Sequence, residues 1–353
     1  MAFHDPIKRY TIKSFGCNTK KTVLSNKKSI DVNRDILAKL LSISIKQEKK
    51  IDFEKALTHP LSEVPLSLCN ADGSMRKTNK SKLAKNILSR IIEESSDFNK
   101  IHTAFIVDFM ALVRTMSQLP ETFEELALKL VQHIPKGYHR IDLVADCYLS
   151  NSIKDAERAK RGQSTKILVK STKSKIPREF SKFLANGENK TRMIELIFET
   201  LEEKKAAVLN TLRTTQLVLS SEQNCKIITL SNCETFQSLV SNQEEADTKV
   251  ITHGLQFLKT NTNHQVIIRS PSGDTDIIVL VVSLLYDYKD RVIIDNGSGK
   301  ERKSIWIGGI ELSQHRCHSL IGLHSFTGND YVSSFFKTGK RSMLEIVREV
   351  PEV

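Results

Sequence analysis

The sequence lacks any close pair of cysteines. Its six cysteines, spread over 353 residues, include no CxxC pair and no tight spacing. Disulfide frameworks and zinc ribbons both depend on closely and regularly spaced cysteines, so this pattern argues against both. We therefore expect reduced thiols and no disulfide-linked partner.

Long apolar runs are also missing. The most apolar stretch, Ile277 to Leu285, is much shorter than the roughly 18 residues that span a bilayer. The start, MAFHDPIKRY, lacks the apolar core of a signal peptide. These absences predict no membrane partner and an intracellular protein, and the chemistry and lysine content described below favour the nucleus over the cytoplasm.

Acidic residues are fewer than basic residues, and the formal net charge is +12. Residues 1–100 carry 20 Lys and Arg against 11 Asp and Glu, and Lys154 to Lys190 carry 11 against 4. A basic excess suits a polyanionic partner, since each neutralised phosphate releases condensed counterions. We expect a nucleic acid, DNA rather than RNA, although a solvated lysine-rich surface explains the N-terminal block equally well.

Two regions of the sequence differ in composition and in the pattern of their apolar residues. Residues 1–100 are rich in Lys, Ser and Asn, and two periodic stretches, Ile36–Ile45 and Leu83–Ile92, predict short helices in a poorly packed basic extension. From Ile101 onward, short apolar runs alternate with helical segments, which is typical of an α/β fold with a mostly parallel sheet. Residues 154–189 lack this regularity and predict a basic, partly helical insertion that handles substrate.

The predicted elements after residue 100 are short. Strands are expected at Ala104–Val107, Ile141–Ala145, Lys226–Leu230, Val266–Arg269 and Ile277–Val282, the last of which could equally begin a helix. Helices are expected at Phe123–His133, Lys190–Arg213, Glu244–Leu258 and Arg341–Val347. A turn at residues 296–300 joins Val292–Ile294 to Ser304–Ile307 in a predicted hairpin.

Aspartates recur where the apolar runs end. Asp108 follows AFIV, Asp146 follows LVA, and Asp274 and Asp276 form a DxD pair after VIIRSPSG. In an open parallel sheet the ligand site lies at the carboxyl ends of the strands, so these acids should converge. Taken singly, each could simply cap a helix or form a turn.

Two further acidic segments join this set. Glu244, Glu245 and Asp247 open a predicted helix, where acids also complement the macrodipole, and Asp330 lies in a late TGND turn. Glu244 is the weaker candidate, at the rim of the site. Crowded carboxylates either take up protons or share cations. Oxygen ligands without His or Cys favour Mg²⁺ or Mn²⁺, and two such ions can promote phosphodiester hydrolysis.

The order and spacing of these acids resemble the flap-endonuclease group of the PIN-like nuclease superfamily, over about residues 101–350. That group carries an Asp on the first strand and another on the second, an EAEA-like motif, a DxD motif and a late Gly-x-Asp. The resemblance implies a three-layer α/β/α domain over residues 101–353 and a structure-selective nuclease with two metal ions. Its metal ligands would be Asp108, Asp146, Glu245, Asp247, Asp274, Asp276 and Asp330.

The resemblance also implies residues that contact phosphate. Lys154 and Arg161 correspond to the Lys and Arg that contact the scissile phosphate in that group, although the same stretch could be a solvated basic helix. Residues 335–341, FFKTGKR, correspond to a shortened duplex-binding helix-turn-helix, or else the sequence is incomplete at its C-terminus. The expected nucleic-acid contacts are Lys166, Lys170, Lys173, Lys175, Lys337, Lys340 and Arg341.

The sequence departs from that group in two ways. A basic extension, residues 1–100, precedes Asp108, and Asp247 stands where Glu is usual. The EEADT and TGND segments also resemble uncharacterised animal multigene proteins of suspected transposon origin. Two other functions therefore stay open: a nucleic-acid-binding protein that keeps the fold without cleaving, and an interaction scaffold whose acids only cap helices.

Overall fold

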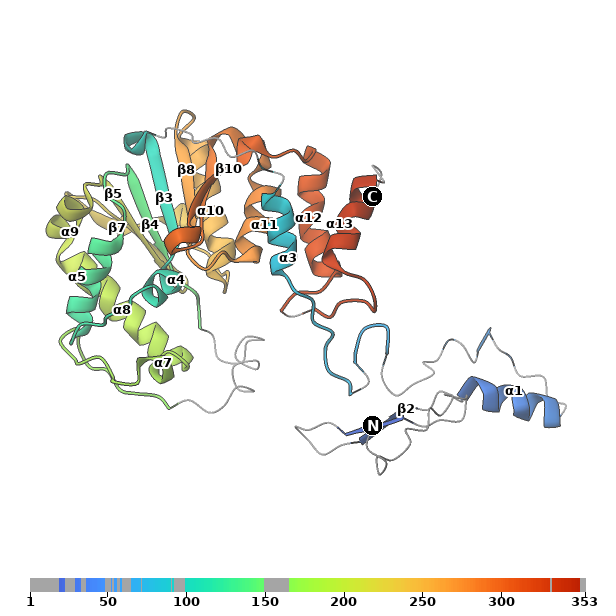
Figure 1. Cartoon of the computed structure of the whole chain (residues 1–353). Coiled ribbons are helices and arrows are strands. Elements are labelled where there is room, and N and C mark those ends of the chain that lie inside the picture. The colour runs from blue at the N-terminus through green and yellow to red at the C-terminus, as the bar shows by residue number, and fades with distance from the viewer. Residues whose placement is uncertain are drawn as a thin grey trace, which may run out of the picture. The chain divides into compact units, whose positions relative to one another are not determined.

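Two compact units make up the chain, and a computed structural model shows their elements (Figure 1). The sheet unit is Ser81–Ile321, and the terminal unit combines Met1–Lys80 with Gly322–Val353. The predicted extension ran to residue 100, whereas the sheet unit begins at Ser81. The structure describes residues 19–22, 29–32, 36–47, 52, 54–55, 58, 65–70, 72–89, 91, 99–148, 165–330 and 332–349.

A mixed eight-stranded sheet forms the centre of the sheet unit. Its strands are β3 (Thr103–Asp108), β4 (Arg140–Val144), β5 (Gln216–Ser221), β6 (Asn224–Ile228), β7 (Cys233–Thr235), β8 (Gln265–Ser270), β9 (Val292–Asn296) and β10 (Lys303–Trp306). The order is β10-β9-β8-β3-β4-β5-β6-β7. The strands from β9 to β5 run parallel, while β10, β6 and β7 pair antiparallel toward the two edges.

Helices cover both faces of this sheet, as the alternation of side chains along its strands requires. Phe105 and Val107 of β3 join the larger core cluster, which also takes in apolar residues of α4 (Phe109–Arg114), α5 (Phe123–His133), α8 (Gly187–Glu203) and α9 (Lys205–Leu212). On the other face α10 (Ala246–Thr260) contacts β3, β4 and β8, and α11 (Thr275–Leu284) packs beside α10. The predicted α/β class, with a mostly parallel sheet between helical layers, is confirmed.

The bounds of α5 follow from its sequence. Thr122 accepts a hydrogen bond from the backbone of Glu125, whose carboxylate accepts one from the backbone of Thr122, and this capping box fixes the start. Phe123, Leu126 and Leu130 lie three and four residues apart and are fully buried. Each such side chain stabilises the fold by roughly 1.5–3 kcal/mol. The helix predicted at Phe123–His133 is confirmed.

A buried charged network fixes α10 on β4. Arg140 donates to both carboxylate oxygens of Asp142, at 2.8 and 2.7 Å, and His253 Nδ1 lies 2.8 Å from Asp142 Oδ2. Burial opposes ionisation of Asp142, yet Arg140 and His253 hold the pKa of that carboxyl below its usual range. Burial lowers the pKa of His253, so the ring is neutral. Since α10 begins with site residues, this network also positions the site.

Two predictions about elements need correction, and one strand was missed. The strand predicted at Ile277–Val282 is wrong, and the alternative of a helix is correct. These residues lie in α11, and the side chain of Asp274 caps that helix. The helix predicted at Lys190–Arg213 begins earlier, at Gly187, and is divided at Lys204 into α8 and α9. Strand β5 was not predicted. The predicted hairpin is confirmed, because β9 and β10 pair antiparallel.

The remaining elements are short. Strands β1 (Thr19–Thr22) and β2 (Ser29–Val32) pair antiparallel in the terminal unit, which also contains α1 (Ile36–Gln47) and α13 (Lys340–Glu349). Helix α3 (Ser81–Leu88) contacts α11 within the sheet unit, and α12 runs from Gln314 to Phe326. Among the described residues, no helix has both the length and the apolar character that crossing a membrane requires.

Candidate metal centre

Asp108 is the last residue of β3 and directly precedes α4. Its Oδ1 accepts hydrogen bonds from the backbone nitrogens of Met110 at 2.7 Å and Ala111 at 3.2 Å, so the residue is a helix cap. Burial, followed by the nearby charge of Asp146, raises the pKa of Asp108 to about 6. Capping uses one of the two carboxylate oxygens, so the same residue can also serve as a ligand.

Asp146 lies two residues beyond β4 and caps a helix that is distant in sequence. Its Oδ1 accepts a hydrogen bond from the backbone nitrogen of Ala246, the first residue of α10, at 2.9 Å. Its Oδ2 accepts one from the hydroxyl of Tyr148 at 3.2 Å. The positive end of α10 therefore stabilises the Asp146 carboxylate and holds it beside the acids of that helix.

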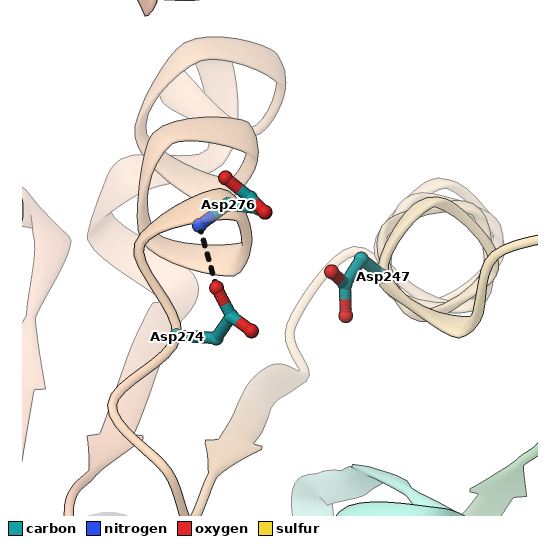
Figure 2. A group of neighbouring side chains, drawn as sticks. All are labelled: Asp247, Asp274 and Asp276. Carbon is teal, nitrogen blue, oxygen red and sulfur yellow. Dashed lines mark hydrogen bonds between the residues drawn. The ribbon is translucent and has the colours of Figure 1, made fainter. Parts of the chain in front are cut away.

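Three carboxylates form the centre of the site (Figure 2). Oxygens of Asp247, Asp274 and Asp276 all lie within 4.8 Å of one another, and the side chain of Asp247 points from α10 toward the start of α11. Asp274 caps α11 by accepting a hydrogen bond from the backbone nitrogen of Asp276 at 3.0 Å. Within the described part of the chain, this is the one group of three or more metal-ligating side chains close enough to share a cation.

The charges of Asp108 and Asp146 also act on Asp247, so these two aspartates lie near the group of three. Burial, followed by the charges of Asp274, Asp108, Asp146 and Asp276 in that order, raises the pKa of Asp247 to about 8. A carboxyl group among four others holds its proton at neutral pH unless a cation replaces it. The structure therefore brings these five aspartates close enough to interact.

The two glutamates precede α10. Glu245 is the residue before its first turn, and its carbonyl accepts a hydrogen bond from the hydroxyl of Thr248 at 2.9 Å. The carbonyl of Glu244 accepts one from the backbone nitrogen of Cys147 at 2.8 Å, next to Asp146. Among the described residues, the buried Oε1 of Glu244 has no hydrogen-bond partner. A buried anionic oxygen of this kind is costly unless a cation or water meets it.

Two residues near the site were not anticipated from the sequence. Lys249 is fully buried in α10, and its ammonium donates to the carbonyls of Ala145 and Glu222, at 3.3 and 2.8 Å, and lies 3.1 Å from Cys147 Sγ. Asn296, at the end of β9, has a buried Oδ1 without a hydrogen-bond partner among the described residues. A lysine in a helix and an asparagine in a hairpin turn are both common on surfaces, so neither pattern signalled a site.

The lysines expected to bind nucleic acid fall into three groups. Lys154 and Arg161 lie outside the described residues. Lys166, Lys170, Lys173 and Lys175 are exposed, and Lys166 forms an ion pair with Glu188. Their segment is held to α8, because Arg192 donates to the carbonyls of Val169 and Lys170 at 3.1 Å each. The segment is therefore an exposed basic strip with a fixed backbone.

The remaining predicted residues belong to the terminal unit. Asp330 is exposed and forms an ion pair with Lys80 at 2.8 Å. Lys337 and Arg341 are exposed, whereas Lys340 is buried, and its ammonium donates to the carbonyl of Gly328 at 2.6 Å. Burial leaves the Lys340 ammonium no surface for a phosphate contact, so its role is to hold the turn before Asp330.

Comparison with known proteins adds no family to this description. No model of a protein family, no curated protein and no solved structure matches the chain. The likeness to PIN-like nucleases stays a prediction from the order of the acids. The site itself is an oxygen-only set of carboxylates near the ends of adjacent parallel strands, and its central group of three could hold a metal ion.

Proposed function

We propose that this protein is a metal-dependent, structure-selective nuclease that hydrolyses nucleic-acid phosphodiesters. The observation that carries the proposal is the group formed by Asp247, Asp274 and Asp276, whose oxygens lie within 4.8 Å of one another, with Asp108 and Asp146 near enough to contribute to the raised pKa of Asp247. Such a cluster weakens a fold unless cations occupy it, and sites of this kind are typical of function. The exposed basic strip on residues 166–175 supplies a surface for the substrate backbone.

The donor set fits hard divalent cations, and we expect two Mg²⁺ or Mn²⁺ ions. Asp247, Asp274 and Asp276 would hold one cation, and Asp108, Asp146 and Glu245 would complete the set for a second. Bound ions of this kind supply an activated water and stabilise the leaving oxygen of a phosphodiester. Asp330, Lys154 and Arg161 enter the proposal only through the resemblance of their motifs.

The basic charge favours nucleic acid as the substrate, and we expect DNA in preference to RNA and a nuclear protein. Ionic contacts from lysines follow the backbone and do not read its sequence. Selectivity for a branched or single-stranded structure would then come from the shape of the strand that reaches the carboxylates.

Cleavage of a branched or single-stranded substrate with Mg²⁺ or Mn²⁺ tests the proposal. Asp274→Asn should abolish cleavage, because it removes a charged ligand while the amide oxygen can still cap α11. Asp290→Asn removes an exposed aspartate in the same unit and should leave the rate unchanged. Cleavage that survives Asp274→Asn, or an absence of cleavage on every nucleic acid, would contradict the enzyme.

Two other functions predict different measurements. A protein that binds nucleic acid without cleaving it would show salt-sensitive binding that EDTA does not alter. A scaffold whose acids only cap helices would show no shift in melting temperature with Mg²⁺ or Mn²⁺, because ligands stabilise only the state that binds them. A metal titration followed by thermal unfolding therefore separates the nuclease from the scaffold, and binding measured with and without EDTA separates the nuclease from the non-cleaving protein.

A further inference from the structure

A cavity of about 350 Å³ lies beside Asp146, between α8 and the turn that joins β5 to β6. Asp146 itself forms part of its wall, so an occupant would adjoin the acidic centre. Pockets for small molecules begin at about 300 Å³, and this volume suits one small planar group.

The wall of this cavity has an unusual polarity for a nucleic-acid enzyme. Its lining residues include Glu195 and Glu222, whose side chains end in carboxyl groups, and Gln223 and Asn224, whose side chains end in amides. Among the described residues, no lysine or arginine lines it. Phosphate is repelled from such a wall, whereas a neutral group that carries N–H donors meets acceptors there.

The turn that forms one side of the cavity is strained and held in place. Glu222 has a φ of 47°, a left-handed conformation that side chains other than Gly, Asn and Asp seldom adopt. The ammonium of Lys249 donates to the carbonyl of this residue at 2.8 Å, and Lys249 is fully buried in α10, the helix that carries Asp247. Strain that surrounding structure maintains is found mostly at functional positions.

We infer that this cavity binds one unpaired nucleobase of the substrate, from a nucleotide next to the scissile phosphate. The inference rests on the proposed nuclease function, because it places the phosphate at the carboxylates and the base in the cavity beside Asp146. Enzymes that hold a base outside the stack read its hydrogen-bonding edge in this way. The substrate is therefore one with an unpaired nucleotide at the cleavage site.

The wall also predicts which bases fit. Carboxylates accept hydrogen bonds and donate none, so Glu195 and Glu222 favour the amino-bearing edges of guanine, cytosine and adenine. Thymine and uracil present two carbonyls and a single N–H on that edge and are disfavoured. Glu195 Oε2 also accepts a hydrogen bond from Arg192 at 2.9 Å, so Oε1 is the oxygen left to meet a base.

A scan of substrates around the cleavage site tests this inference. Replacing one nucleotide at a time by an abasic unit should lower kcat/KM about tenfold at one position only, with thymine also disfavoured there. The double variant Glu195→Gln, Glu222→Gln should no longer distinguish the abasic substrate from the intact one. It should cleave the abasic substrate as fast as the wild-type enzyme cleaves that same substrate. Glu203→Gln, at the exposed end of α8, should keep the discrimination.

Two further measurements keep the inference independent of folding and of turnover. Glu222→Gly removes the carboxylate while retaining the turn, because glycine adopts positive φ without strain, and it should lower discrimination in the same way. With Ca²⁺ in place of Mg²⁺, an oligonucleotide carrying 2-aminopurine should gain fluorescence at one position, and the double variant should lose that gain.

The outcomes separate the base site from the nuclease. A fluorescence gain without any cleavage would support the base site and contradict the nuclease. Cleavage without a sensitive position, or a double variant that slows abasic and intact substrates equally, would overturn the base site and leave the nuclease standing.

Discussion

Protonation of Asp247 couples the stability of the fold to pH and to metal binding. Its pKa, raised to about 8, means that the folded state holds this proton more tightly than the unfolded chain, where the value is near 3.8. The stability contributed by the group is complete below the unfolded pKa and is lost as pH rises through about 8. Without metal, the fold should therefore weaken in mildly alkaline solution.

Replacing Asp247 by asparagine should remove this loss of stability at alkaline pH. Asp247→Asn removes the titration and the repulsion, so the metal-free variant should exceed the wild type in free energy of unfolding by about 1 kcal/mol or more at pH 9. At pH 4 the two proteins should be nearly equal. Urea unfolding in EDTA at both values measures the difference, with Asp290→Asn as the control. An equal gain at the two pH values would contradict the shifted pKa.

At the scale of elements, Lys249 ties three segments together. Its ammonium joins the end of β4, the β5–β6 turn and α10, through the carbonyls of Ala145 and Glu222. Two of these segments carry metal-site aspartates and the third borders the cavity. The residue thus stands outside the proposed chemistry but sets the spacing of the groups that perform it.

Removing this ammonium should be costly. Lys249→Met keeps the volume but removes the ammonium that donates to the buried carbonyl of Ala145 and the part-buried carbonyl of Glu222, so the free energy of unfolding should fall by about 2–4 kcal/mol. Lys259→Met, at an exposed position near the end of the same helix, should change it little. Denaturant unfolding compares the two variants, and similar losses in both would show that Lys249 holds nothing together.

The sequence predicted the proximity of the aspartates better than it predicted the elements around them. Asp108, Asp146 and Asp274 could be placed because parallel strands end at one edge, whatever the lengths of the strands. The run from Ile277 to Val282 carries no period that separates helix from strand, and the Asp274 cap decides it. Lys249 and the cavity depend on contacts between residues that are distant in the sequence, such as Lys249 and Ala145, which a local pattern cannot show.

At the scale of the whole molecule, the net charge of +12 coexists with a site made of acids. The basic and acidic groups must therefore occupy different surfaces if the substrate is a polyanion. Residues 166–175 form such a basic surface on the sheet unit, with a backbone fixed to α8. Binding strength should then depend on these positions more than on total charge.

Two triple variants of equal charge separate these effects. Lys170, Lys173 and Lys175→Gln should weaken binding to single-stranded DNA and reduce the salt dependence of log K by about 0.7 for each phosphate that is no longer neutralised. Lys136, Lys259 and Lys300→Gln, also exposed, should leave the slope nearly unchanged. Binding titrations at several salt concentrations measure both, and equal slopes would indicate a diffuse attraction.

The order in which the chain supplies its aspartates has a consequence for biosynthesis. Asp108 and Asp146 come early, Asp247 follows, and Asp274 and Asp276 lie on the far side of β8, which inserts next to β3. A nascent chain therefore cannot bring Asp247, Asp274 and Asp276 together until β8 and the residues that follow it have left the ribosome. Until then, the edge of β3 that pairs with β8 has no partner strand.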